Sequence, residues 1–328
     1  MMEITDFKLS VLIPVYNSES TIGDLVTTVI DTLQSRVGAV EIVLVNDGSR
    51  DRSDVEARKL CKRFPGQVRY VQLARNFGEH NAVMCGLHHT TGDGVAIIDD
   101  DFQNPPGEIL PLVEKLLEGY DVVYSYYEEK RHNLFRNLGS RFNNLVAAKL
   151  LRKPPGLYLS SFKVLNRFLV DTVIAYDGPY PYLDGLILRS TDSIAKVKVR
   201  HADRTQGRSN YNLRRLVGLW LNMFTGFSIG PLRLASFLGM AMSALGVLLA
   251  VFFIVSWQVG GLFSHRPIPP GWASLIVTMV FFSGAQLLVL GVVGEYIGRL
   301  FLTQTRAPQF IVRDAVGLDT DRGEQGRD

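Results

Sequence analysis

Three consecutive carboxylates, Asp99, Asp100 and Asp101, follow directly after the apolar run 95–98. A short apolar run is typical of a buried strand in a parallel sheet, and ligands of such sheets bind at the carboxyl ends of the strands. Adjacent carboxylates repel one another unless a cation lies among them, and oxygen ligands suit Mg²⁺ or Mn²⁺. We therefore expect a divalent metal site here, with a solvated acidic turn as the alternative.

Polar clusters also end the three earlier apolar runs of the chain, around 14–19, 46–49 and 74–80. Because the carboxyl ends of parallel strands meet at one edge of a sheet, we expect these clusters to converge with the three carboxylates. A glycine before a helix permits close approach of backbone or ligand. The candidate residues are Pro14, Tyr16, Asn17, Glu19, Asp47, Gly48 and Arg75.

The first 125 residues alternate between apolar runs and helical patterns, which predicts an α/β fold with a mostly parallel sheet and helices on both faces. The expected strands are 9–14, 40–45, 68–73, 95–98 and 122–125. The expected helices are near 20–35, 51–63, 79–90 and 106–118.

Two long stretches toward the C-terminus, 234–264 and 267–294, contain no charged residue. Each is longer than the roughly 20 apolar residues that cross a bilayer core. We predict transmembrane helices at 232–257 and 272–297, with a pair of buried core helices as the alternative.

Charge around these stretches predicts an orientation. The connection between them holds only His265 and Arg266, whereas arginines lie on their outer flanks. The positive-inside rule then places both termini in the cytoplasm of an integral inner- or plasma-membrane protein. We expect no signal peptide, and two cysteines are too few for a disulfide framework. The flanking arginines are Arg214, Arg215, Arg233, Arg299 and Arg306.

These patterns divide the chain into segments. We expect a cytosolic α/β domain at 1–210, an interfacial amphipathic helix at 211–231, the two spans, and a cytosolic tail at 298–328 that is disordered from about 315. Residues 128–160 form a basic amphipathic stretch, which suits anionic headgroups or a phosphate, with a solvated helix face as the alternative.

Several motifs together resemble glycosyltransferase family 2, whose members have a GT-A nucleotide-sugar-binding fold. They include the pair Asp99-x-Asp101, the segment Arg-Asn-Phe-Gly at 75–78, Asp-Phe-Gln-Asn-Pro-Pro at 101–106 and Arg-x-x-Gly-x-Ser at 204–209. The last two, with the C-terminal spans, resemble the branch that acts on polyprenyl phosphate. The likeness covers about residues 8–312.

The resemblance implies a membrane-anchored, inverting transfer of a sugar from a nucleotide sugar, with a UDP-sugar favoured, to polyprenyl phosphate on the cytosolic face. Asp99 and Asp101 would hold Mg²⁺ or Mn²⁺, which neutralises the departing diphosphate, and Asp101 and Asp184 are the candidate catalytic carboxylates. The lipid bilayer is a further partner, nucleic acid is not, and a homo-oligomer is left open. The implied substrate-binding residues are Pro14, Tyr16, Asn17, Glu19, Asp47, Gly48, Arg75, Asp100, Lys163, Arg204, Arg208 and Ser209.

The chain departs from the family pattern at a few positions. Asn46 and Ser18 stand where acids are usual, and Leu157 stands where the branch carries an aspartate before the Ser-Phe-Lys segment at 161–163. A phosphate acceptor has a second pKa of about 6 and is largely ionised near pH 7, so it needs orientation more than a base. Asp184 is open to a catalytic role or to a turn role.

Two alternatives to this function are a transferase that acts on another lipid or on protein, and a catalytically silent scaffold of the same fold. A processive polysaccharide synthase is disfavoured because the chain has no Gln-x-x-Arg-Trp segment. We interpret His80, His88 and His89 as structural, because they show no metal-ligand spacing supported by other ligands.

Overall fold

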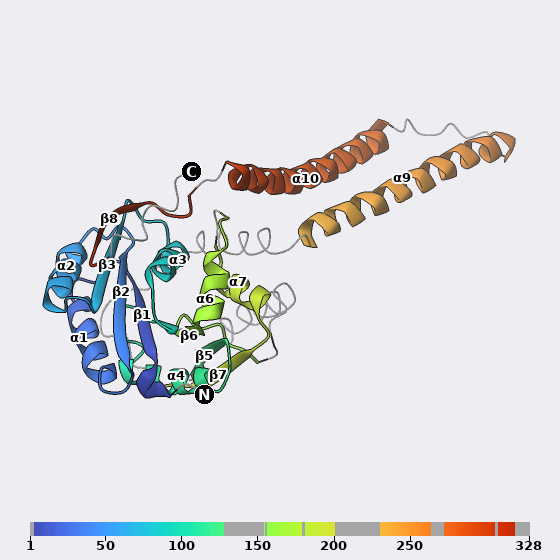
Figure 1. Ribbon diagram of the computed structural model, residues 1–328. Coiled ribbons are helices and arrows are strands. Elements are labelled where there is room, and N and C mark those ends of the chain that lie inside the picture. Colours follow the sequence, from blue (N-terminus) through green and yellow to red (C-terminus); the bar gives the residue numbers. More distant parts are fainter. Residues whose placement is uncertain are drawn as a thin grey trace. The chain divides into compact units, whose positions relative to one another are not determined.

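The computed structural model describes residues 3–127, 154, 156–178, 181–200, 230–263, 272–305 and 308–318. The chain divides into two compact units (Figure 1). One comprises Met1–Asn212 together with Arg306–Asp328, and the other comprises Leu213–Thr305.

The first unit is built on an eight-stranded sheet with the strand order β7-β5-β6-β4-β1-β2-β3-β8. β6 and β8 pair antiparallel with their neighbours, and the other pairings are parallel. This confirms the predicted α/β class, and the five predicted strands are present to within one residue. The strands are β1 (Lys8–Val15), β2 (Ala39–Asn46), β3 (Val68–Leu73), β4 (Gly94–Ile97), β5 (Val122–Tyr126), β6 (Lys163–Asn166), β7 (Ile194–Lys198) and β8 (Val312–Val316).

Helices cover both faces of this sheet, and the alternation of side chains along β1 explains why. Val11 and Ile13 belong to the main apolar core, to which α1, α2 and α4 contribute. Leu12 lies on the other face, where α3 packs so closely that a Cβ on Gly86 would overlap the Leu12 side chain. The helices are α1 (Ile22–Leu33), α2 (Ser53–Arg63), α3 (Glu79–His89), α4 (Ile109–Leu117), α6 (Arg167–Ile174) and α7 (Leu183–Ser190), with 3-10 turns η1 (Ile4–Asp6) and η2 (Pro106–Glu108).

The strand register brings the predicted polar clusters to one edge of the sheet. Val15 pairs with Asn46 at the ends of β1 and β2, and Leu12 pairs with Ile97 at the end of β4. The turns that follow these strands lie at the same edge of the sheet, where Asp100 accepts the N–H of Tyr16, which confirms the predicted convergence.

Three strands, β6, β7 and β8, were not predicted. β6 inserts antiparallel between β4 and β5, which carries the segment 161–163 to the end of β4. β8 lies along β3 (Figure 1). The backbone N–H of Ala74 donates to the carbonyl of Ile311 at 2.8 Å just beyond this pairing. Our expectation of disorder from about 315 is therefore wrong for the end of β8.

The second unit contains α9 (Gly230–Phe263) and α10 (Trp272–Gln304), which contact each other. Within its described residues, the segment Phe281–Gln304 of α10 is long and apolar enough to cross a membrane, and the apolar segment Leu232–Leu248 of α9 is shorter. Both predicted spans are helical. Among the described residues, only α10 contains a candidate crossing segment, which lies further along the chain than we predicted. Both membrane spans stay predictions.

Several predicted features lie outside the described residues. They are most of the basic stretch 128–160, nearly all of the interfacial helix 211–231, and the tail from 319 onward.

Candidate active site

Asp47 anchors the loop that follows β3. Its buried carboxylate accepts hydrogen bonds from the backbone N–H groups of Phe77 at 2.6 Å and of Gly78 at 2.9 Å. Burial raises the pKa of Asp47, and these two hydrogen bonds oppose the rise. Gly48 has a φ of +67°, and a Cβ there would stand 2.6 Å from the backbone nitrogen of Asn76. We predicted that Gly48 permits the close approach of backbone, and the backbone that approaches it is that of the loop after β3.

Hydrogen bonds connect the turn after β1 with the turn after β2. Asn17 accepts the N–H of Arg50 on its Oδ1 at 2.8 Å and donates its own N–H to the Ser49 hydroxyl at 3.0 Å. Glu19 accepts the N–H of Arg52 at 2.8 Å, where α2 begins. In the structure the Asn17 and Glu19 side chains therefore position loops.

Two predicted substrate-binding side chains are open to solvent at the same edge. Tyr16 is 38% exposed. The exposed Arg75 lies over the Phe77 ring, 4.8 Å from its centroid. Aromatic faces stack on bases, and guanidinium groups pair with phosphates, so both remain suitable for a nucleotide. Pro14 is half-buried within β1.

Asp100 is held by the turn after β1. Its Oδ2 accepts the N–H of Tyr16 at 3.0 Å and the hydroxyl of Ser18, and its backbone carbonyl accepts the Thr21 hydroxyl at 2.8 Å. Burial raises its pKa, and these side-chain hydrogen bonds oppose the rise. Within the described parts of the chain, no three carboxylate, histidine or cysteine side chains converge to hold a metal. The predicted metal ligands are Asp99 and Asp101 only, and their role stays a prediction, as does the substrate-binding role of Asp100.

Asp99 is oriented by two polar side chains to which we had assigned no role. Ser161 donates its hydroxyl to Oδ2 of Asp99 at 2.6 Å, and Nδ2 of Asn104 lies 3.4 Å from the same oxygen. Asn104 is itself fixed by the Tyr127 hydroxyl at 2.5 Å. Both were within recognised motifs, the segments 101–106 and 161–163, so the signal was present in the sequence.

Asp99 and Asp101 fit a divalent ion whose coordination a substrate completes. Two carboxylates are few for a site made by protein alone. Mg²⁺, however, is commonly held by one or two carboxylates together with substrate phosphates and water. The chemistry of this pair therefore suits a metal that arrives with, or binds, a diphosphate.

Lys163 and Asp184 form a buried ion pair, with side chains 3% and 11% exposed. The Tyr124 hydroxyl donates to the same Oδ1 of Asp184 at 2.9 Å, and the Lys163 nitrogen lies 5.0 Å from the centroid of the Tyr124 ring. This arrangement does not fit the predicted roles of Lys163 as a phosphate ligand and of Asp184 as an open base, because each group is already bound by the other.

Glu79 is the first residue of α3 and faces the same acidic surroundings. Glu79 is exposed, and its side chain forms no hydrogen bond or ion pair with another residue that the structure describes. Its pKa is raised to about 7, first because protein atoms displace water around it and then because Asp99 and Asp184 carry like charge, while Lys163 opposes the rise. We had assigned no role to Glu79 from the sequence, although it directly follows the motif at 75–78.

Two departures from the family pattern have structural explanations. Leu157 is buried, so an apolar side chain fills the position of the usual aspartate. Asn46 donates its Nδ2 to the Tyr70 hydroxyl at 3.0 Å and accepts the N–H of Ser49 on Oδ1 at 2.9 Å. An amide supplies both a donor and an acceptor, which an ionised carboxylate does not.

The histidines of α3 make ring contacts. His80 meets the Tyr182 ring edge-on with centroids 5.3 Å apart, and His88 lies 5.9 Å from the Phe310 ring. Burial lowers the pKa of both histidines and of His89. The predicted acceptor residues Arg204, Arg208 and Ser209 lie outside the described residues.

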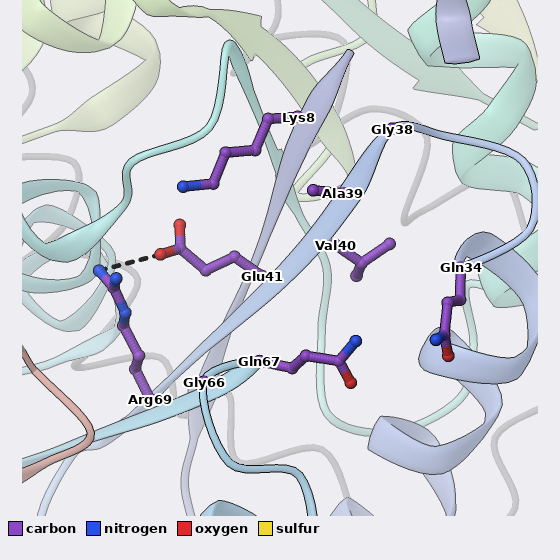
Figure 2. Close-up of a pocket in the computed structure, with 9 residues that line it drawn as sticks. All are labelled: Lys8, Gln34, Gly38, Ala39, Val40, Glu41, Gly66, Gln67 and Arg69. Atoms are coloured by element: carbon purple, nitrogen blue, oxygen red, sulfur yellow. Dashed lines mark ion pairs between the residues drawn. The ribbon is translucent and has the colours of Figure 1, made fainter. Parts of the chain in front are cut away.

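A polar hollow of about 400 Å³ lies at the opposite, amino ends of β1 to β3 (Figure 2). Glu41 in its wall is ion-paired with Arg69 at 2.9 Å and accepts the Ser10 hydroxyl at 2.5 Å. The Lys8 ammonium donates to the Thr91 hydroxyl at 2.6 Å. Because these charges are bound to protein groups, we assign the hollow to the stability of the sheet.

Residues 10–174 match the family described as Glycosyl transferase family 2, and the chain belongs to this family. It is therefore a glycosyltransferase. It is similar along nearly its whole length to undecaprenyl-phosphate 4-deoxy-4-formamido-L-arabinose transferases. Identity is 34% to that of Pseudomonas paraeruginosa, over 94% of this chain and 90% of the relative. It is 33% to that of Salmonella choleraesuis over 94% of each chain, and 31% to that of Yersinia pestis over 97% and 96%.

Solved structures of glucosyl-3-phosphoglycerate synthase from Mycobacterium tuberculosis share the fold. One is 22% identical, with a TM-score of 0.50 over 67% of this chain and 78% of that chain. Another, which holds Mn²⁺, UDP and phosphoglyceric acid, is 23% identical with a TM-score of 0.50 over 67% and 76%. This likeness supports the GT-A-like α/β fold.

Proposed function

We propose that this protein transfers a sugar from a nucleotide sugar, with a UDP-sugar favoured, to a polyprenyl phosphate at the cytosolic face of a membrane. The observation that carries the proposal is the Asp99-x-Asp101 pair. The pair lies at the same edge of the sheet as Asp47, which anchors the loop that follows β3. It occurs in a chain similar over 94% of its length to undecaprenyl-phosphate sugar transferases.

The donor would bind along the loops that follow β1, β2 and β3, with Tyr16 and Arg75 as its open contacts. Asp99 and Asp101 would hold Mg²⁺ or Mn²⁺, and such an ion neutralises negative charge on the departing diphosphate. Ser161 and Asn104 already orient Asp99, so little reorganisation accompanies the reaction. The Mn²⁺ and UDP in the mycobacterial synthase support a divalent ion at this site.

The acceptor would react without a general base. A phosphate monoester has a second pKa of about 6, so its oxygen attacks the anomeric carbon as an anion. The new carbon–oxygen bond forms as the bond to the diphosphate breaks on the opposite face, which inverts the configuration. The pairing of Asp184 with Lys163 supports this mechanism because it leaves Asp184 no open proton-accepting role. Arg204 and Arg208 stay our predicted acceptor ligands.

The path of the chain supports a hairpin of two membrane spans. The chain leaves the first unit before α9 and rejoins its sheet as β8 after α10. A chain that returns to its starting domain crosses a membrane an even number of times. If α10 spans the membrane, α9 therefore spans it as well, although its described apolar segment is the shorter one.

The proposal is tested with full-length protein in lipid nanodiscs that contain undecaprenyl phosphate, labelled UDP-sugars and Mg²⁺ or Mn²⁺. We expect label in the lipid extract. Asp101→Asn should lower transfer by about 100-fold or more, because leaving-group charge is then poorly neutralised, without lowering the unfolding temperature. Asp31→Asn, on the exposed face of α1, is the matched control.

Two results would contradict the proposal. One is sugar found on proteins or soluble alcohols but never on the polyprenyl phosphate. The other is near-normal transfer by the Asp101→Asn variant in the presence of a metal chelator.

A further inference from the structure

Glu79 stands between two parts of the candidate site. The N–H of the preceding residue, Gly78, is bound to Asp47 on the nucleotide side. The ring of the following residue, His80, meets the ring of Tyr182, two residues before Asp184, with centroids 5.3 Å apart. Asp99, Asp184 and Lys163 act on the Glu79 carboxylate through their charges. Glu79 is therefore near the point where the diphosphate of a donor would meet its sugar.

No described protein group satisfies this carboxylate. Among the described residues Glu79 has no hydrogen-bond or ion-pair partner, and it is exposed at the edge of the sheet where the donor would bind. Like-charged neighbours make such a carboxylate unfavourable in the free protein. A ligand that supplies hydrogen-bond donors would remove this unfavourable state.

The chemistry of an ionised carboxylate limits which ligand this is. In its ionised form Glu79 accepts hydrogen bonds and donates none, and it repels the phosphates of both substrates. A sugar is neutral or cationic, carries hydroxyl or N–H donors, and is attached directly to the diphosphate. Of the parts of the two substrates, the sugar is therefore the one that suits Glu79.

Resting on the proposed function, we propose that Glu79 accepts a hydrogen bond from a hydroxyl or N–H group of the donor sugar and so selects the sugars that are transferred. The structural alternative is that an acidic residue in the first turn of α3 only stabilises the helix dipole. That role would affect the stability of the fold and would not distinguish one sugar from another.

The test compares full-length wild-type, Glu79→Ala and Glu79→Gln proteins in nanodiscs with undecaprenyl phosphate. The donors are UDP-glucose, UDP-galactose, UDP-xylose and UDP-N-acetylglucosamine, and then deoxyfluoro analogues of the best one, each lacking one hydroxyl donor. For one analogue, wild-type kcat/KM should fall by about 10- to 100-fold, as expected for a hydrogen bond to a charged group. Glu79→Ala should lose less than about 3-fold for that analogue because the hydrogen bond is already absent.

Binding of UDP with Mn²⁺, measured by calorimetry, should be unchanged in Glu79→Ala, since UDP lacks the sugar. Glu114→Ala, which removes an exposed acid on α4, is the matched control and should keep the wild-type donor profile. Parallel losses in wild type and Glu79→Ala for every analogue would overturn the inference. So would a lowered unfolding temperature with an unchanged donor profile, or an equal loss of UDP and UDP-sugar affinity.

These outcomes separate the two proposals. Wild-type transfer with an unaltered profile in the variants leaves the proposed function intact and overturns the role of Glu79. A wild-type protein that transfers no sugar from the donor panel contradicts the proposed function, and the inference fails with it.

Discussion

At the scale of single residues, Lys163 and Asp184 form an ion pair in which each side chain compensates the charge of the other. Both are almost fully buried, and the Tyr124 hydroxyl adds a hydrogen bond to the same carboxylate oxygen. Replacing one member of a buried pair leaves the other charge without compensation. Such losses are much larger than those of exposed ion pairs.

Lys163→Met should therefore lower the free energy of unfolding by about 3–5 kcal/mol, because Asp184 keeps a buried charge without its cation. Urea denaturation of the full-length protein, followed by fluorescence, measures this. The double variant Lys163→Met with Asp184→Leu removes both charges and should recover most of the loss. A single variant as stable as wild type would contradict the buried-pair interpretation.

Residue types located the candidate site but did not assign each side chain. Asp99, Asp100 and Asp101 are chemically equivalent in the sequence, yet Asp100 is captured by an N–H and a hydroxyl from the turn after β1. That difference depends on which loop each carboxylate meets in the folded chain, since Asp99 instead accepts the Ser161 hydroxyl. Hydrogen bonds between loops far apart in sequence leave no local pattern from which to predict them.

At the scale of elements, strand burial decided what could be predicted. β1 and β2 are nearly continuous apolar runs because both faces of the sheet are covered. β8 is mostly exposed, and its sequence Val-Arg-Asp-Ala-Val has no strong periodicity, so only its pairing with β3 makes it a strand. An edge strand of this kind is defined by its neighbour.

Deleting 308–328 should loosen the loop at 75–78. The deletion removes the partner of β3 and the hydrogen bond from Ala74 to Ile311, immediately before Arg75. We expect faster amide hydrogen exchange in β3 and weaker binding of UDP with Mn²⁺, measured by mass spectrometry and calorimetry.

The control for this deletion is Asp314→Asn, which removes only the ion pair with Arg58 at 2.7 Å. That pair is partly exposed and contributes little to stability, so exchange and binding should stay near wild type. Unchanged exchange in β3 after the deletion would show that β8 does not support the loop.

At the scale of the whole molecule, the chain before α9 and the chain after α10 belong to the same compact unit. The chain on both sides of α9 and α10 contributes strands to the same sheet. The arginine flanks and the return of the chain therefore predict the same topology from independent observations.

A reporter that is active only outside the cytoplasm should work when inserted in the connection 264–271 and fail after Asp328. Enzymatic activity of the reporter in intact cells measures this, and a reporter active only in the cytoplasm at the same two points is the control. External activity at the C-terminal fusion would contradict an even number of crossings.

The return of the chain to its sheet also sets an order of events during synthesis. β3 ends at Leu73, but its partner β8 begins only at Val312. At about 5–20 residues per second the ribosome needs roughly 10–50 s to cover that distance. During this interval the edge of β3 is open to pairing with other nascent chains. α9 and α10 leave the ribosome before β8, so the sheet is completed only after both apolar helices have been synthesised.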